Sequence, residues 1–238
     1  MATQKMIRAL FFAAIPVLAA ALSNFAQAAE LPPLDATVSY YSKSINHAGV
    51  TETQHYRNLL IRRKDHVWLE RIVPQGKTVV PTRDPAAGRS GHKHVDFETS
   101  AQHLSRIVNG AIRADYIDRG QLQIVFVPPT EYSVSGFDGS WDNAASMVAE
   151  KIVKAMPLSK RATAVANSEW REEQNNGWYN RVLWSNTLKV ALVVESGKTD
   201  GSVTRKTELE VRPLTPDSAL PWKQLTLYAQ KEYDDFMD

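Results

Sequence analysis

The chain has 238 residues, 43% of them hydrophobic and 23% charged, which is enough apolar material for a folded core. It contains no cysteine, and this excludes a disulfide framework, thiolate metal sites, cysteine nucleophiles and lipid attachment to an N-terminal cysteine. The formal net charge is +2, which gives no strong field that would attract nucleic acid.

Residues 1–28 have the order of a secretory signal peptide. Lys5 and Arg8 precede an apolar run at 9–22, and small residues follow at 26–28. The run is shorter than the roughly 20 residues that cross a bilayer, so we expect cleavage before Ala29 and no transmembrane anchor. Residues 29–238 are then predicted to be a single exported domain in the periplasm, with no nucleic acid as a partner.

Segments with strand periodicity, separated by short turn signals, predict an antiparallel meander. Asn109–Gly110 is the strongest local signal, because both residue types tolerate the positive φ that a tight hairpin turn requires. Arg62, Arg63 and Lys64 are expected at an exposed hairpin tip. The predicted strands are residues 38–41, 51–63, 67–73, 103–108, 111–117, 121–127, 169–174, 178–184, 189–195 and 203–211.

Two segments depart from this pattern. Apolar residues at three- and four-residue intervals between Ser140 and Pro157 predict an amphipathic helix, with Ser140 as its cap and Asp142 in its first turn. A second helix is expected at about 228–237. A sheet of so many strands does not stay flat. We therefore predict an α+β fold, a curved antiparallel β-sheet with one or two helices covering its concave face.

The order of these features resembles the periplasmic lipoprotein-carrier superfamily, which includes the LolA and LolB carriers and the N-terminal domain of RseB-type stress regulators. The stretches that carry the resemblance are 56–63, 67–71, 136–141 with the helix after it, 181–184 and 188–192. The resemblance implies a half-barrel closed by helices, an apolar cavity for acyl chains and no catalytic residues. Two departures are the missing cysteine for lipid attachment and the absence of a second domain of the RseB kind.

The first functional hypothesis is a non-catalytic periplasmic binding protein that holds a lipid, a lipoprotein acyl chain or a hydrophobic partner segment between sheet and helix. The apolar periodicity of the predicted strands and helix makes four residues the candidates for lining the cavity: Leu60, Trp68, Met147 and Val148. An enzyme is not expected, since the chain has no serine elbow, phosphate loop or His-Glu-x-x-His helix. A further alternative is a subunit of an envelope assembly that contacts a protein partner through an exposed loop at 76–91.

The six histidines all lie between residues 47 and 103. On a strand, His92, His94 and Asp96 would share one face, and a hairpin loop at 98–101 would place His103 opposite Asp96. Imidazole and carboxylate ligands suit copper or zinc. The alternative function is therefore periplasmic metal binding or delivery, and the competing interpretation is a set of solvated polar side chains on the outer face of the sheet.

Overall fold

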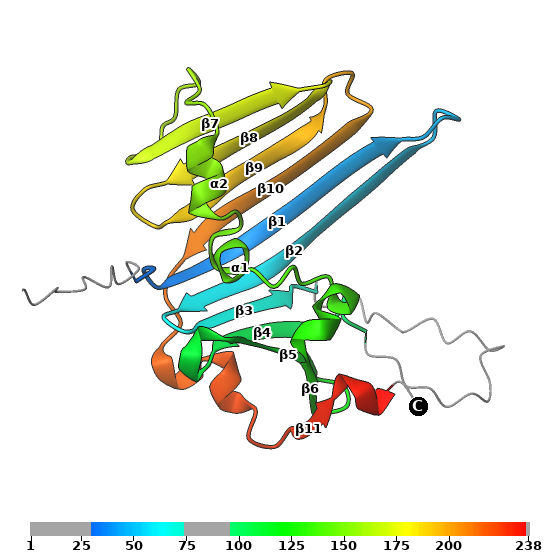
Figure 1. Cartoon of the computed structure of the whole chain (residues 1–238), viewed down its shortest axis with the longest axis vertical. Helices are drawn as coiled ribbons and strands as arrows, with labels where there is room; N and C mark the ends of the chain where they lie inside the picture. The colour runs from blue at the N-terminus through cyan, green and yellow to red at the C-terminus, as the bar shows by residue number, and fades with distance from the viewer. Residues whose placement is uncertain (1–29, 74–95, 237–238) are drawn as a thin grey trace, which may run out of the picture.

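The computed structural model describes residues 30–73 and 96–236, so the predicted signal peptide lies outside the described residues. Eleven strands form one unclosed sheet, in the order β11-β6-β5-β4-β3-β2-β1-β10-β9-β8-β7 (Figure 1). Every neighbouring pair is antiparallel except β11 with β6. The strands are Leu34–Ile45 (β1), Thr51–Arg63 (β2), His66–Arg71 (β3), Ala101–Arg106 (β4), Ile112–Asp118 (β5), Gln123–Val127 (β6), Ser168–Asn175 (β7), Trp178–Ser185 (β8), Val190–Lys198 (β9), Val203–Arg212 (β10) and Ala229–Glu232 (β11).

The predicted meander is confirmed within β1 to β6 and within β7 to β10, and the pairing of β1 with β10 joins these two parts into one sheet. Asn109 and Gly110 have φ of 82° and 75°, and Asn176 and Gly177 have φ of 48° and 77°. These are the left-handed conformations that tight hairpin turns require. The expectation of a curved antiparallel sheet with few helices is also confirmed, since Figure 1 shows the sheet bending between β1–β2 and the shorter strands β3 to β6.

Successive side chains of each strand point to opposite faces of the sheet, and both faces carry apolar residues. Leu60 of β2 packs in a buried cluster with α1 (Trp141–Ser146), and we call this side of the sheet the helix face. Its neighbour Ile61 packs on the other side of the sheet, which we call the opposite face, where Leu220 from the C-terminal segment covers it. A third cluster places Val153 of α2 (Glu150–Ala155) against β8 and β9.

The single helix predicted between Ser140 and Pro157 is wrong, because α1 and α2 are separate. Ser140 does cap α1, accepting a hydrogen bond from the Asn143 backbone N–H at 3.2 Å. The helix ends because the Ala145 carbonyl oxygen accepts from Arg62 at 2.7 Å, where a continuous helix would bond it to the N–H of Ala149. That N–H donates to the Asn143 side chain at 2.9 Å, and Met147 takes a φ of 66°.

The second predicted helix, at about 228–237, is also wrong. Residues 229–232 form β11, which pairs in parallel with β6 at the edge of the sheet. The short turn Tyr233–Phe236 (η5) follows it. Strand pairing prevails here because an unpaired sheet edge leaves a row of backbone groups without partners. Among the described helices, none is long and apolar enough to cross a membrane.

Candidate functional site

Half-buried apolar side chains surround the buried cluster of the helix face. They come from β1, β3, β9, β10 and the break between α1 and α2, and we call them the apolar belt: Tyr40, Leu69, Met147, Leu192 and Leu209. A continuous helix would extend its apolar stripe over the sheet. Since each helix has only 6 residues, the belt keeps part of its apolar surface in contact with water.

The structure brings together three of the four predicted cavity residues and separates the fourth. Leu60 is buried under the belt, Met147 belongs to the belt, and Val148 packs against the adjacent cluster of α2. Trp68 lies on the opposite face, where its Nε1 donates to Glu70 at 3.0 Å. The reason is the register of the β2–β3 hairpin, which pairs Trp68 with Ile61 and leaves Leu60 opposite Leu69.

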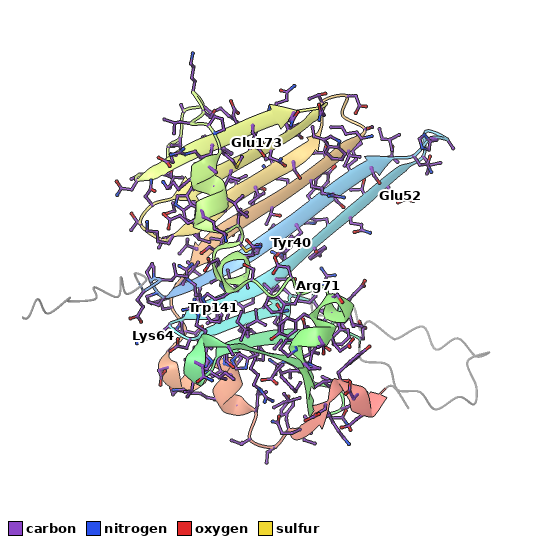
Figure 2. All side chains as sticks on the ribbon, in the orientation of Figure 1. Tyr40, Glu52, Lys64, Arg71, Trp141 and Glu173 are labelled. Carbon is purple, nitrogen blue, oxygen red and sulfur yellow. The ribbon has the colours of Figure 1, made fainter. Side chains whose placement is uncertain are left out.

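A polar cluster adjoins the belt where β1, β2 and β3 run side by side. The rings of Tyr40 and Tyr56 stack with centroids 4.7 Å apart, and the Arg71 guanidinium carbon lies 3.7 Å from the Tyr56 centroid (Figure 2). Burial raises the pKa of Tyr40 above its ordinary value. Asn58 Oδ1 and Arg71 Nη1 are buried without a hydrogen-bond partner. The cluster was not predicted, because its members come from three strands whose register the sequence leaves open.

Arg62 lies buried beneath the helix face and links several segments of the chain. Its predicted place at an exposed hairpin tip is wrong. Arg62 is fully buried, and burial lowers its pKa to about 10. Its guanidinium donates only to backbone carbonyl oxygens, those of Pro32 at 3.0 Å, Ala145 at 2.7 Å, Leu188 at 2.5 Å and Lys189 at 3.2 Å. One side chain therefore connects β2 to the N-terminal segment, to α1 and to the turn between β8 and β9.

A pocket of about 370 Å³ opens at the rim of the helix face, where the β2–β3 turn meets α1 and α2. We call it the rim pocket. Its wall includes the buried indole of Trp141, whose Nε1 has no hydrogen-bond partner. The Arg106 guanidinium carbon lies 4.3 Å from the centroid of the same ring. Figure 2 labels Lys64 and Trp141, which both line this pocket.

The opposite face carries a histidine pair. His66 Nδ1 and His103 Nε2 share a hydrogen bond of 3.0 Å, and the Trp222 ring stacks on both imidazoles with centroids 4.9 Å and 5.4 Å away. Burial, with His66 and Arg113 nearby, lowers the pKa of His103 to about 4. Burial also raises the pKa of Asp115, the β5 neighbour of His103.

The predicted register around the metal candidates is wrong. His103 pairs with Trp68 and Asp115, while Asp96 lies in a turn and accepts the backbone N–H of Glu98 at 3.0 Å. His92 and His94 lie outside the described residues. Within the described ranges, no group of three or more histidine, cysteine, aspartate or glutamate residues could hold a metal ion. Copper or zinc binding stays a prediction, which calorimetry on the parent and a His94→Ala variant tests.

No family model matches the chain, and no curated protein matches it. Among solved structures, PNGF-II is similar over 85% of this chain and 33% of its own length, with 11% identity and a TM-score of 0.38. The chain thus spans about a third of that protein. A candidate outer membrane lipoprotein-sorting protein domain from Vibrio parahaemolyticus is similar over 81% of this chain and 89% of its own, with 12% identity and a TM-score of 0.29. Its description names the superfamily that the sequence resembles, but both TM-scores are too low to bear on function.

Proposed function

We propose that the chain is a non-catalytic binding protein that holds an apolar chain on the helix face. The ligand is a lipid, a lipoprotein acyl chain or a hydrophobic segment of a partner protein. The observation that carries the proposal is the apolar belt, which the two short helices leave partly open to water. The predicted signal peptide supports a periplasmic location for such a binding protein.

The free energy available at such a surface comes from removing methylene groups from water. Each buried methylene contributes about 0.8 kcal/mol, so a chain of some ten methylenes contributes more than any surface ion pair of the protein. Part of that gain is offset by the lost freedom of the ligand. Burial of the chain on the apolar belt therefore supplies binding free energy without any specific polar contact.

Decanol binding tests the proposal, because decanol presents a chain with no charge. We expect delipidated protein to bind it by calorimetry, and we expect an organic extract of the protein purified from its cells to contain lipid by mass spectrometry. A Met147→Asp variant places a charge in the belt and should weaken decanol binding by about tenfold or more.

The matched control is Ile152→Asp, which places the same charge on an exposed residue of α2 outside the belt. It should bind decanol like the parent protein. Equal loss in both variants, or a delipidated parent protein that binds no decanol, would contradict the proposal.

A further inference from the structure

We propose that residues 151–167 dock on a membrane surface that contains anionic lipids. These residues, which we call the basic segment, comprise most of α2 and the loop that leads from it to β7. The docking surface goes beyond the proposed function. Only its purpose, the transfer of an apolar chain between the membrane and the apolar belt, rests on that function.

The first argument is the charge of the basic segment. It contains no aspartate or glutamate and four exposed cations: Lys151, Lys154, Lys160 and Arg161. The whole chain has 28 basic and 26 acidic residues, so this excess of cations is local. Within the described residues, Lys151 and Lys160 form no ion pair. Cations gathered in this way are attracted to the headgroups of anionic lipids.

The carboxylates next to the basic segment do not cancel its charge, because each is shared by two cations. Glu169 lies 2.6 Å from Lys154 and 2.9 Å from Arg171. Glu195 lies 3.2 Å from Arg161, and a second arginine lies 3.8 Å from the same carboxylate. The surface therefore stays positive around both carboxylates, which favours an anionic partner.

The second argument is that aliphatic side chains lie exposed among these cations. Ile152, Leu158 and Val165 are 48%, 64% and 46% exposed. Val153 and Met156 pack against β8 and β9, which leaves Ile152 on the solvent side of α2. Aliphatic groups between lysines suit the boundary of headgroups and acyl chains, where the first enter the apolar layer and the second contact the headgroups. This combination favours a lipid surface over an acidic protein.

The third argument is the place of the basic segment at the end of the sheet. Figure 1 shows α2 and the loop after it beside β7, the last strand in the sheet order. The Ser159 backbone N–H donates to the Trp170 carbonyl oxygen at 2.9 Å, and the Pro157 carbonyl oxygen accepts from the Glu172 N–H at 3.0 Å. The loop thus occupies the edge of β7 at these residues and blocks the addition of another strand there. What remains for a partner is the layer of side chains.

The basic segment wraps around this edge and presents cations from both faces of the sheet. Lys154 pairs with Glu169, while the Arg161 guanidinium carbon lies 4.2 Å from the centroid of the Trp170 ring. Glu169 and Trp170 are consecutive in β7, so they point to opposite faces. A convex surface of this kind fits a flat partner such as a bilayer. Met147 of the apolar belt lies just before α2 in the chain, so docking places the belt next to the membrane.

Sedimentation with vesicles tests the docking surface on the full chain. One set of vesicles is phosphatidylcholine alone, and the other is an equimolar mixture of phosphatidylcholine and phosphatidylglycerol. The charge variant combines Lys151→Gln with Lys160→Gln. Its matched control combines Arg212→Gln with Lys231→Gln, which removes two exposed cations that lie outside the basic segment and form no ion pair in the described part of the chain.

We expect the parent protein to bind the mixed vesicles and to bind phosphatidylcholine alone at least about tenfold more weakly. The charge variant should bind the mixed vesicles about tenfold more weakly than the parent, and its control should bind within about twofold of the parent. Added salt should weaken the binding of the parent, because it screens exposed charges. Equal binding of the parent to both kinds of vesicle, binding to neither, or equal binding of the charge variant and its control overturns the proposal.

A second pair of variants tests the aliphatic part of the surface. Leu158→Gln should weaken binding to the mixed vesicles by about threefold or more, since less apolar area enters the lipid. Leu227→Gln changes a side chain that is 86% exposed outside the basic segment and should bind like the parent. Equal binding of these two variants contradicts the entry of Leu158 into the lipid layer. None of the substituted side chains belongs to the apolar belt, so failure to bind vesicles leaves the proposed function standing, and failure to bind decanol leaves the docking surface standing.

Discussion

Arg62 is a buried cation that is satisfied by carbonyl oxygens alone. Four acceptors from three separate segments surround its guanidinium. Arginine suits this position because its planar group offers five donors in fixed directions, whereas a lysine ammonium offers three. The neighbouring Arg63 has the ordinary arrangement, an ion pair of 2.6 Å with Asp35. Sequence alone does not distinguish these two adjacent arginines, because only the strand's orientation decides which one points into the helix face.

Replacing Arg62 by methionine should lower the free energy of unfolding by about 4 kcal/mol. The variant keeps most of the apolar volume but leaves buried carbonyl oxygens without donors, at about 1–3 kcal/mol each before relaxation. Urea unfolding at neutral pH measures the change. Arg57→Met, at an exposed position on the same strand, is the control and should change stability by less than about 0.5 kcal/mol. A parent-like Arg62→Met variant would show that the carbonyl oxygens find other partners.

The pair formed by buried His103 and half-buried His66 gives the stability a pH dependence of known sign. Because the pKa of His103 is about 4 in the folded protein and 6.5 as a free group, the unfolded chain binds more protons between these values. Stability from this group is present above pH 6.5 and is lost as the pH falls toward 4, by up to about 3 kcal/mol. The lowered pKa of His66 acts in the same direction, and the raised pKa of Asp115 in the opposite one.

A comparison with His103→Gln isolates the contribution of His103. The variant should show a flatter decline in unfolding free energy from pH 6.5 to pH 4 than the parent protein. His55→Gln, at an exposed position, should keep the parent profile. Parallel profiles for the parent and His103→Gln would mean that His103 does not carry the effect.

At the scale of single elements, the strands were predictable and the helix was predictable only in part. The turns Asn109–Gly110 and Asn176–Gly177 specify their own geometry, so the strands next to them could be located from local sequence. The apolar stripe continues through Met147 without a break in its period. The break depends on Arg62, which is distant in sequence, and no local pattern at Met147 signals it.

The β9–β10 hairpin requires a glycine at position 197, because neighbouring atoms leave no space there for a Cβ atom. A Cβ atom on Gly197 would lie 2.9 Å from Tyr179 Oη and 3.2 Å from Thr204 Cα, and closer still to the Val203 carbonyl oxygen. Gly197→Ala should therefore force β9 away from β10 and destabilise the protein by at least about 2 kcal/mol. Thermal unfolding measures the change. Ser196→Ala, one residue earlier, should be nearly neutral, and equal stability of both variants would contradict the argument.

At the scale of the whole molecule, the segment that connects β10 to β11 covers the opposite face of the sheet. Asp35, which is 1% exposed, fixes the start of this segment through the Thr215 backbone N–H at 2.7 Å and the Arg63 ion pair. Leu220 and Trp222 then pack on Ile61 and Trp68. The sequence did not predict this cover, because residues 214–228 have neither strand nor helix period. Their partners on the sheet are identified only once the register is known.

Leu220 is the residue on which this cover depends most. It is 2% exposed and packs in the cluster of the opposite face, whereas Leu227 in the same segment is 86% exposed. Leu220→Ala should lower the unfolding free energy by about 3 kcal/mol, and Leu227→Ala should change it by less than about 0.5 kcal/mol. Limited proteolysis should also cut the segment faster in Leu220→Ala, because its docking on β3 to β6 is weakened. Decanol binding should be the same in both variants, since neither residue lies on the helix face. Loss of decanol binding in Leu220→Ala alone would show that the two faces of the sheet are coupled.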